Sequence, residues 1–326
     1  MLHVAVLDDF QGVARAMGPW ERLGDELELT VLREHVDEPE ALAAAIGDAE
    51  VVVAMRERTR LDAALFARLP HLRLVITTGS ANVAIDVAAA TAHGVTVCGT
   101  GYGPPPPQPP RTSSTAELAW ALLLAVARQV PQEDRALREG RWQTTLGRDL
   151  GGLRLGVIGL GRLGRQVAGF GKAFDMDVVA WSQNLTADAA REAGVRAVSR
   201  DELLSTADAV SIHLVLGERS RGLLGAEELA LMKPDAILVN TSRGPIVDED
   251  ALVAALEAGR LGGAGLDVFA TEPLPADHPL VRAPRTVLTP HIGFVTEATY
   301  RRWYPEIVAG IAAWRAGAPT QVIAQD

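Results

Sequence analysis

Three residues whose side chains suit acid–base chemistry each follow a predicted β-strand in the second half of this chain. Arg243 comes after a strand predicted at 236–240, Glu272 after one at 264–268, and His291 after one at 286–289. An arginine can hold a carboxylate and an adjacent oxygen through two parallel hydrogen bonds. A histidine can take up or release a proton, and a neighbouring glutamate favours its protonated form and fixes its tautomer. These residue types predict proton transfer on a small anion.

The order of the strands gives these side chains a common location. In a parallel sheet the carboxyl ends of the strands lie along one edge, where ligands bind. Taken singly, each residue also has an ordinary structural explanation. Arg243 could simply be an arginine in a turn, Glu272 a solvated loop residue, and His291 a loop histidine whose hydrogen bonds are made within the protein. Because all three occupy successive strand ends, we predict that they form one catalytic set.

A glycine-rich loop opens from the same edge. Gly159, Gly161 and Gly164 have the spacing G-x-G-x-x-G between a strand predicted at 155–158 and a following helix. The spacing alone is weak in a chain with 31 glycines, and a turn without a ligand is the alternative. Between a strand and a helix, however, it is typical of dinucleotide binding, because the glycines admit a pyrophosphate and the helix N-terminus favours phosphates. We therefore predict a dinucleotide site in the loop 159–164, which includes Arg162 and Leu163.

The acidic residue that usually contacts the ribose is missing. In such sites an aspartate or glutamate follows the glycines by about 20 positions and binds the ribose 2′-hydroxyl. Here the second strand ends at Trp181 and continues with Ser182. No carboxylate repels a 2′-phosphate, and no adjacent arginine attracts one. The choice between NAD and NADP stays open, and Ser182 is expected at the ribose.

The elements that position these residues alternate along the whole chain. Short β-branched strands alternate with alanine- and leucine-rich helices, which is typical of parallel sheets with helices on both faces. A length of 326 residues predicts about two domains. We expect a first series of strands near 3–7, 27–32, 50–54, 72–77 and 95–98. We expect a second series near 155–158, 177–181, 209–214, 236–240, 264–268 and 286–289.

Helices are expected between these strands and at two further places. A helix is predicted from residue 113 or 114 to about 130, and a long one at 296–316. Between the two strand series, the run at 104–110 contains six prolines, which excludes a helix or a central strand. We interpret it as an extended loop insertion in preference to a recognition motif for a partner.

Composition and charge exclude several classes of function. The formal net charge of −10 argues against nucleic acid or an anionic membrane as the main partner. No stretch has the roughly 18 apolar residues that a membrane span needs, and the N-terminus predicts a strand and not a signal peptide. The single cysteine, Cys98, is interpreted as a core residue. We expect a cytoplasmic protein and assign no metal site.

The motifs of the second half resemble, in order and spacing, those of the D-isomer-specific 2-hydroxyacid dehydrogenase family. The segments are Gly159–Gly164, Asn240–Gly244, Asp267–Pro273 and Pro290–Gly293. The resemblance covers nearly the whole chain. It implies an oxidoreductase that transfers a hydride between NAD or NADP and C2 of a small D-2-hydroxy or 2-oxo acid. Arg243, Glu272 and His291 would then be the catalytic residues.

The resemblance also implies a fold of two doubly wound α/β domains. A Rossmann-type cofactor domain would comprise 101–294, and a discontinuous, flavodoxin-like substrate domain 1–100 and 295–326, with both ligands in the cleft between them. The helix beginning near Ser114 matches the part of the family fold used for dimerisation. A homodimer is therefore expected by analogy.

Further ligand contacts are implied by the same resemblance. Thr241 and Ser242 join the cofactor site, and Asp267 matches the position that contacts the nicotinamide amide. In the substrate domain, Gly79 and Ser80 match the loop that holds the substrate carboxylate. Arg56, after the third strand, adds a second positive contact or is simply an exposed arginine.

Some features depart from the family pattern or leave other interpretations open. His213 matches a structural position near the cofactor, so no catalytic role is assigned to it, and Val215 replaces a usual proline.

One alternative to an enzyme is a dinucleotide-sensing binding protein, similar to corepressors of this fold. Another is a dehydrogenase of formate or phosphite. Within the main interpretation, the candidate substrates include glyoxylate, hydroxypyruvate, branched 2-oxo acids and phosphorylated ones.

Overall fold

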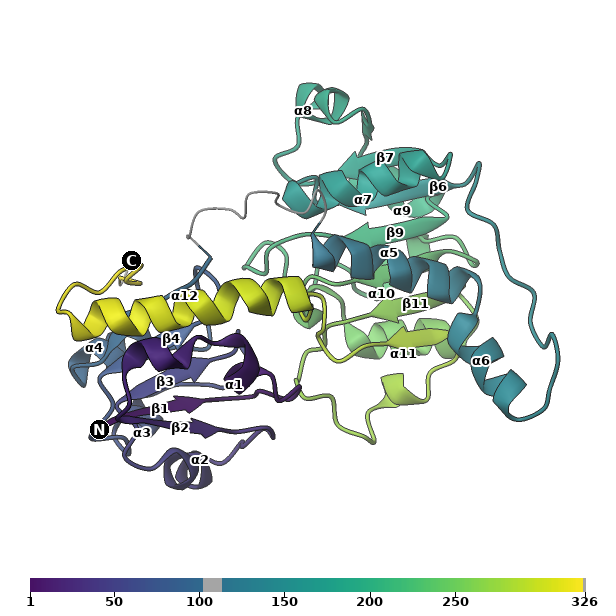
Figure 1. Ribbon diagram of the computed structural model, residues 1–326. Coiled ribbons are helices and arrows are strands. Elements are labelled where there is room, and N and C mark those ends of the chain that lie inside the picture. The colour runs from purple at the N-terminus through teal and green to yellow at the C-terminus, as the bar shows by residue number, and fades with distance from the viewer. Residues whose placement is uncertain (102–112, 325–326) are drawn as a thin grey trace. The chain divides into compact units, whose positions relative to one another are not determined.

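Alternating β-branched and alanine-rich segments form two parallel sheets, each covered by helices on both faces (Figure 1). The computed structural model describes residues 1–101 and 113–324, so the proline run at 104–110 lies outside the described residues. The chain divides into two compact units, one comprising Met1–Pro109 and Glu297–Asp326 and the other Pro110–Thr296. The predicted fold class, α/β with two doubly wound parallel sheets, is confirmed.

The first unit contains a five-stranded parallel sheet in the order β2-β1-β3-β4-β5. This is the doubly wound order of flavodoxin-like folds. The strands are β1 (Leu2–Val6), β2 (Leu27–Val31), β3 (Val51–Ala54), β4 (Leu74–Thr77) and β5 (Thr96–Cys98). The helical segments are α1 (Ala14–Met17), η1 (Trp20–Leu23), α2 (Pro39–Ile46), α3 (Ala63–Phe66), α4 (Val87–Ala92) and α12 (Glu297–Arg315).

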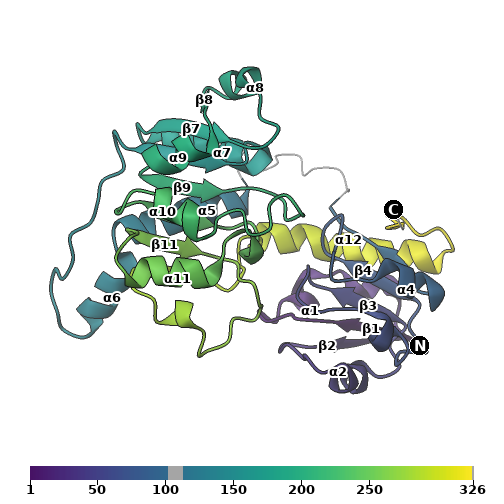
Figure 2. The same ribbon diagram turned by 180° about the vertical axis from the view of Figure 1, so that it is seen from behind.

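Helices cover both faces of this five-stranded sheet. The C-terminal helix α12 packs with α1 and η1 on one face, while α2, α3 and α4 lie on the other (Figures 1 and 2). Strands β3 and β4 are buried along their whole length, because a strand covered on two sides has no solvated face. Because the strands are parallel, the loops after β1, β3 and β4 lie at the same carboxyl edge of the sheet. Arg56 and Gly79 belong to these loops.

The second unit contains a seven-stranded parallel sheet in the order β12-β11-β10-β9-β6-β7-β8. The strands are β6 (Arg154–Ile158), β7 (Asp177–Trp181), β8 (Arg196–Ala197), β9 (Ala209–Ile212), β10 (Ile237–Asn240), β11 (Gly263–Leu266) and β12 (Thr286–Leu288). Counted from β8, the first six strands have the order of the dinucleotide-binding fold. The direction in which successive strands are added to the sheet reverses between the neighbours β6 and β9. The glycine loop leaves β6 at this reversal, where ligands bind in open α/β sheets.

The helices of the second unit also lie on both faces of its sheet. They are α5 (Ser114–Ala127), α6 (Val130–Arg138), α7 (Arg162–Ala173), α8 (Ala187–Glu192), α9 (Arg200–Thr206), α10 (Ala226–Leu231), η2 (Gly244–Ile246), α11 (Glu249–Glu257) and η3 (Pro279–Val281). Figure 1 shows α5 and α7 in front of the sheet, and Figure 2 shows α9, α10 and α11 in front of its other face.

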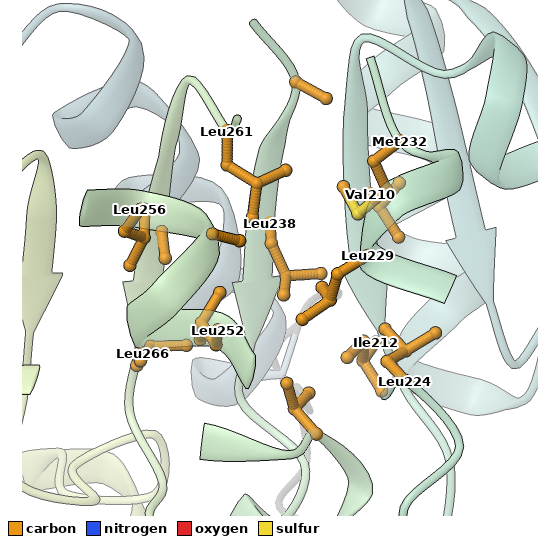
Figure 3. Packing of buried hydrophobic residues seen from close by; sticks show 14 of the residues in the cluster. Val210, Ile212, Leu224, Leu229, Met232, Leu238, Leu252, Leu256, Leu261 and Leu266 are labelled. Carbon is orange, nitrogen blue, oxygen red and sulfur yellow. The ribbon is translucent and has the colours of Figure 1, made fainter. Parts of the chain in front are cut away.

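An apolar core fills each face of the seven-stranded sheet. One core packs α10 and α11 on the sheet and includes Leu229 and Leu238 (Figure 3). The other packs α5 and α7 and includes Leu122 and Val239. Leu238 and Val239 are neighbours in β10 but belong to different cores, because successive side chains of a strand point to opposite faces. These cores hold the strand ends in fixed positions relative to one another.

Two elements of the second unit differ from the sequence expectation. The helix expected to reach about residue 130 ends at Ala127, because Gln129 adopts a left-handed φ of 50°, and a separate helix α6 begins at Val130. Strand β8 consists of two residues and is too short to produce a periodic sequence pattern. Neither difference moves a predicted site residue.

Two expectations drawn from composition concern Cys98 and membrane spans. Cys98 ends β5 with 1% of its surface exposed, and burial raises the pKa of its thiol. This environment suits a core residue and disfavours the reactive thiolate. Within residues 1–101 and 113–324, no helix is long and apolar enough to cross a membrane.

A buried aspartate connects three segments at the amino edge of the second sheet. Asp208 accepts hydrogen bonds from the backbone N–H of Arg154 at 2.7 Å, from Arg148 Nη2 at 3.0 Å and from Lys233 Nζ at 3.0 Å. Burial alone would raise the pKa of Asp208, but the hydrogen bond from Arg154 and the two cations lower it below its ordinary value. The ionised carboxylate therefore stabilises the start of β6 and β9.

Replacement of Asp208 by asparagine tests this contribution. Asp208→Asn is expected to lower the free energy of unfolding by about 2 kcal/mol at neutral pH, because charge-assisted hydrogen bonds are lost. Since the pKa is lower in the folded state, the stabilisation is complete above the unfolded pKa and is lost as pH falls through the folded pKa. Urea unfolding of both proteins should show the gap narrowing toward the lowest pH at which both remain folded. An equal gap at every pH would exclude a role for the charge.

Candidate active site

The glycine loop combines two structural glycines with one that leaves space for a ligand. Gly159 has a φ of 96° and donates its N–H to the carbonyl of Trp181 at 2.8 Å. A Cβ on Gly159 would lie 2.5 Å from the carbonyl oxygen of His213, and one on Gly164 only 1.9 Å from that of Gly159. A Cβ on Gly161 would meet no atom of residues 1–101 or 113–324 within 4 Å. Only Gly161 borders open space.

The open position next to Gly161 suits a pyrophosphate. Gly161 is the N-cap of α7 and provides no side-chain hydrogen bond to the first turn. The N–H groups of that turn and the positive end of the helix dipole therefore remain available to an anion. Arg162 is exposed beside them, while Leu163 packs partly against the core of α5 and α7. The residues present fit a dinucleotide.

The end of β7 has an arginine neighbour that is distant in the sequence. Ser182 follows β7, and the next residue, Gln183, donates its Nε2–H to the carbonyl of Arg219 at 3.0 Å. The side chain of Arg219 is exposed. No local sequence signal connects Arg219 with Ser182, because the two loops meet only through the pairing of β6 with β7 and β9. A cation therefore lies in the loop next to the expected ribose position.

The turn that contains Arg243 is organised by Asn240 at the end of β10. The buried Asn240 amide donates to the carbonyl of Arg243 at 3.0 Å, and its Oδ1 accepts from the N–H of Ser242 at 3.0 Å. Ser242 Oγ donates to the carbonyl of Ile212 at 2.8 Å. Arg243 Nη1 donates to the carbonyl of Ser242 at 2.7 Å. Sequence analysis did not single out Asn240, although an asparagine at a strand end is a typical turn residue.

The Arg243 turn packs directly on the loop that carries Glu272. A Cβ on Gly244 would lie 2.0 Å from the carbonyl carbon of Phe269, so only a glycine permits this approach. The N–H of Phe269 in turn donates to Glu272 Oε1 at 2.8 Å. One backbone contact and one hydrogen bond thus connect the residue after Arg243 with the carboxylate of Glu272.

The carboxylate of Glu272 contacts the imidazole of His291. Glu272 Oε2 lies 2.6 Å from His291 Nδ1, and the two side chains are 31% and 19% exposed. His291 has a left-handed φ of 52°, and its ring packs edge-on against Phe294 with centroids 5.7 Å apart. Within the described residues, Nε2 has no hydrogen-bond partner. The predicted proximity of the glutamate and the histidine is present, with Nε2 available to a substrate.

Asp267 fixes the loop in which His291 lies. Its Oδ1 accepts from Thr289 Oγ1 at 2.6 Å and from the N–H of Ile292 at 2.8 Å, and its Oδ2 accepts from the N–H of Gly293 at 2.8 Å. Asp267 is 1% exposed. Burial raises its pKa, although these hydrogen bonds and His291 act in the opposite direction. Its observed contacts position the loop, and its contact with a nicotinamide amide stays a prediction.

Two buried polar atoms near the ends of β9 and β10 lack partners in the described part of the chain. They are Thr241 Oγ1 and His213 Nδ1. The other ring nitrogen of His213 contacts Ser211 Oγ at 2.8 Å, and burial lowers the pKa of His213 to about 4. A neutral imidazole suits the structural role expected for His213. Unsatisfied atoms at this edge are consistent with a polar ligand that completes their hydrogen bonds.

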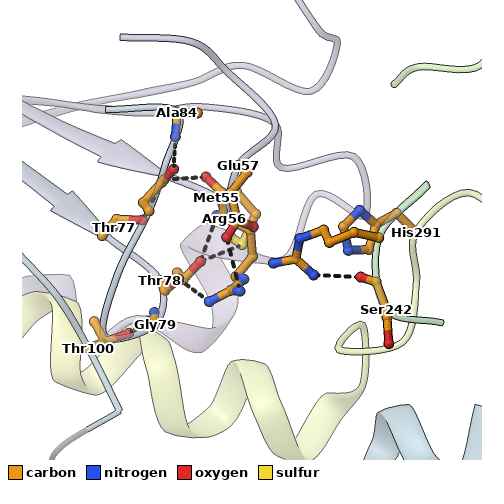
Figure 4. Close-up of polar contacts among 12 residues, drawn as sticks. Met55, Arg56, Glu57, Thr77, Thr78, Gly79, Ala84, Thr100, Ser242 and His291 are labelled. Carbon is orange, nitrogen blue, oxygen red and sulfur yellow. Dashed lines mark hydrogen bonds and ion pairs between the residues drawn. The ribbon is translucent and has the colours of Figure 1, made fainter. Parts of the chain in front are cut away.

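The predicted substrate-binding residues meet at the carboxyl edge of the first sheet. Arg56 donates from its N–H to Thr78 Oγ1 at 2.9 Å and from Nη1 to the carbonyl of Thr78 at 3.2 Å (Figure 4). Gly79 has a φ of 104°, and its N–H donates to Thr100 Oγ1 at 2.8 Å. The Gly79 amide thus has an internal partner. Ser80 is exposed and donates no backbone hydrogen bond within the described residues.

Known proteins with a similar sequence identify the family. A family model described as D-isomer specific 2-hydroxyacid dehydrogenase, NAD binding domain, matches residues 120–293. A glyoxylate reductase from Korarchaeum cryptofilum is 39% identical over 263 residues, which cover 79% of this chain and 77% of that protein. The chain belongs to the D-isomer-specific 2-hydroxyacid dehydrogenase family. As a member of this family, it is an NAD(P)-dependent oxidoreductase of 2-hydroxy acids.

Two further similarities extend over most of the chain. A D-3-phosphoglycerate dehydrogenase from Mycobacterium bovis is 38% identical over 299 residues, covering 90% of this chain but only 54% of that protein. The chain thus spans about half the length of this relative. The crystal structure of a phosphoglycerate oxidoreductase from Vibrio cholerae has a TM-score of 0.89 and 34% identity, covering 98% of this chain and 100% of that chain. These relatives support the interpretation of the chain as a dehydrogenase and not the alternative interpretation as a dinucleotide-sensing binding protein.

A pair of glycine substitutions separates cofactor binding from folding. Gly161→Ala should leave the melting temperature unchanged, because its Cβ meets no atom of the described part of the chain, yet weaken NADH binding about tenfold or more by occupying the pyrophosphate space. Gly164→Ala should instead destabilise the fold by about 1–3 kcal/mol, because its Cβ overlaps the Gly159 carbonyl. Thermal unfolding and fluorescence titration with NADH measure both effects. Unchanged NADH affinity in Gly161→Ala would place the pyrophosphate elsewhere.

Proposed function

We propose that His291 is the acid–base residue of a D-2-hydroxyacid dehydrogenase, with Glu272 as its partner. The observation that supports this assignment is the 2.6 Å contact between Glu272 Oε2 and His291 Nδ1. A carboxylate at this distance keeps a proton on Nδ1 and stabilises the imidazolium charge. His291 Nε2 then donates a proton to the C2 oxygen during reduction and removes it during oxidation.

Arg243 is proposed to bind and polarise the substrate. Its guanidinium holds the carboxylate and the C2 oxygen in a fixed orientation, which a lysine does not reproduce. The Asn240 hydrogen bonds and the close approach of Gly244 to Phe269 keep this turn rigid. When bound, the nicotinamide of NAD or NADP supplies or accepts the hydride at C2. Arg243 stabilises the charge that develops on the C2 oxygen.

The two units are proposed to divide the binding functions between them. The second unit holds the dinucleotide through Gly161, Arg162 and the first turn of α7. Thr241 and Ser242 are proposed cofactor contacts, and Thr241 Oγ1 is buried without a partner among the described residues. The first unit contributes Arg56 and Ser80 to the substrate carboxylate, and Gly79, whose N–H is bonded to Thr100, provides the left-handed turn that places them. The substrate class is that of short 2-oxo acids, and a formate or phosphite dehydrogenase is the alternative that a substrate panel distinguishes.

The proposed acid–base role of His291 is tested by a histidine-to-asparagine pair. His291→Asn should lower kcat by about 10²- to 10⁴-fold for the reduction of 2-oxo acids, because the proton donor is lost. The affinity for NADH should not change. His71→Asn is the matched control, because its side chain is 60% exposed in the first unit. Absorbance assays of NADH oxidation measure the rate, and wild-type turnover by His291→Asn would refute the assignment.

We propose that the second unit accepts NADP as well as NAD. No carboxylate follows β7, and the backbone of Arg219 is hydrogen-bonded to Gln183 next to Ser182. An arginine near the ribose accommodates a 2′-phosphate. Arg219 therefore provides the cation that the local sequence around Ser182 lacks.

Arg219→Ala should weaken the binding of NADPH about tenfold while the affinity for NADH stays the same, because only NADPH carries the 2′-phosphate. Arg221→Ala is the control, since it removes an arginine two residues away in the same loop. Fluorescence titration with each dinucleotide measures the affinities. Equal losses for NADPH and NADH, or none for either, would remove Arg219 from the ribose site.

A homodimer and a cytoplasmic location complete the proposal. Exposed apolar side chains follow α5 in α6 and the segment after it: Val130, Leu137, Trp142 and Leu146 are 54%, 58%, 75% and 93% exposed. A second copy of the chain would cover such a surface. Light scattering coupled to size-exclusion chromatography distinguishes a dimer from a monomer.

A further inference from the structure

At the carboxyl edge of the first sheet, the described loops after β1 to β4 have more acidic than basic side chains. The loops after β1, β2, β3 and β4 carry twice as many acidic residues as arginines. The arginines are Arg33, Arg56, Arg58 and Arg60, and the acidic residues are Asp8, Asp9, Glu34, Asp37, Glu38, Glu57, Asp62 and Asp86. The side chains of these four loops therefore carry more negative than positive formal charge, although the substrate is an anion.

The arginine proposed to contact the substrate is paired with an acidic neighbour. Arg56 Nη2 lies 3.3 Å from Glu57 Oε1, and the side chains are 23% and 17% exposed. Figure 4 shows Glu57 next to Arg56, while Nη1 of this arginine is directed to the carbonyl of Thr78. The ion pair offsets the charge of Arg56 at short range. The pair can orient one substrate carboxylate but supplies little net positive charge for a second anion.

The next arginine, Arg58, is held by the β1 loop. Its Nη1 donates to the carbonyl of Asp8 at 2.9 Å, and its guanidinium stacks on the ring of Phe10 with 4.7 Å to the centroid. These contacts orient Arg58 toward the chain segment after β1. It lies beside two nearly buried acidic residues, Asp8 and Asp9, which are 2% and 1% exposed. These contacts hold Arg58 against the β1 loop, where the carboxylate of Asp8 itself contacts His35 at 2.8 Å.

We infer that this edge selects 2-oxo acids with an uncharged substituent at C3 and disfavours phosphorylated or dicarboxylic ones. Glu57 is the specificity-determining residue, because it offsets Arg56 and repels a second anionic group on the substrate. The inference rests on the proposed function, in which Arg56 and Ser80 of the loops after β3 and β4 bind the substrate carboxylate. It deepens that proposal by naming the charge class of the substrate.

The test compares hydroxypyruvate with its phosphate ester, 3-phosphohydroxypyruvate, which differs only in the phosphoryl group. The wild-type protein should have a kcat/KM at least tenfold higher for hydroxypyruvate. Glu57→Gln should raise kcat/KM for the phosphate ester about tenfold and change that for hydroxypyruvate much less. Glu57→Ser should shift the ratio in the same direction, which separates the charge from the exact shape of the side chain. Added salt should reduce the wild-type preference, because it screens the repulsion.

Glu28→Gln is the matched control, since it removes one exposed carboxylate from β2 of the same unit without altering the carboxyl edge. It should leave the ratio of the two substrates unchanged. A wild-type preference for the phosphate ester, or an unchanged ratio in both Glu57 variants, would overturn the inference while the dehydrogenase function stands. Failure of the wild-type protein to reduce any 2-oxo acid would overturn the proposed function and this inference together.

Discussion

The contact between Glu272 and His291 is the interaction on which the rest of the candidate site depends. The imidazole is presented by a residue with a left-handed φ, a conformation that non-glycine residues rarely adopt. Asp267, 1% exposed, holds this loop through three hydrogen bonds. Glu272 is held by the N–H of Phe269. The two carboxylates thus have different roles. The buried Asp267 fixes the backbone of the loop, and the more exposed Glu272 contacts the imidazole of His291.

The parallel sheet explains why segments far apart in the sequence cooperate. Strands β10, β11 and β12 are neighbours, so the turns that follow them meet at one edge. Glycine contributes where two backbones must approach, as Gly244 does against Phe269 and Gly164 against Gly159. The two apolar cores on the faces of the sheet hold these strand ends in fixed positions relative to one another. The geometry of the edge therefore follows from burial of the strands, and the chemistry follows from the residues placed just beyond them.

The sequence predicted the parts of this arrangement that depend on local pattern. The glycine loop lies between β6 and α7, and the three charged residues follow successive strands, because strand and helix periodicity and turn residues are local signals. Contacts through space had no such signal. The hydrogen bond between Gln183 and Arg219 and the close approach of Gly244 to Phe269 each join segments far apart in the sequence, and only the folded chain defines them. The break after Ala127 was missed because the apolar pattern continues across Gln129.

The coupling between Glu272 and His291 is measured most directly by a double-mutant cycle. The quantities compared are kcat/KM for reduction of a 2-oxo acid by the wild-type protein, Glu272→Gln, His291→Asn and the double variant. If the carboxylate acts through the imidazole, the double variant should be about as slow as His291→Asn alone, because the partner has nothing left to act on. Losses that simply multiply would show that the two residues act independently and would contradict the account.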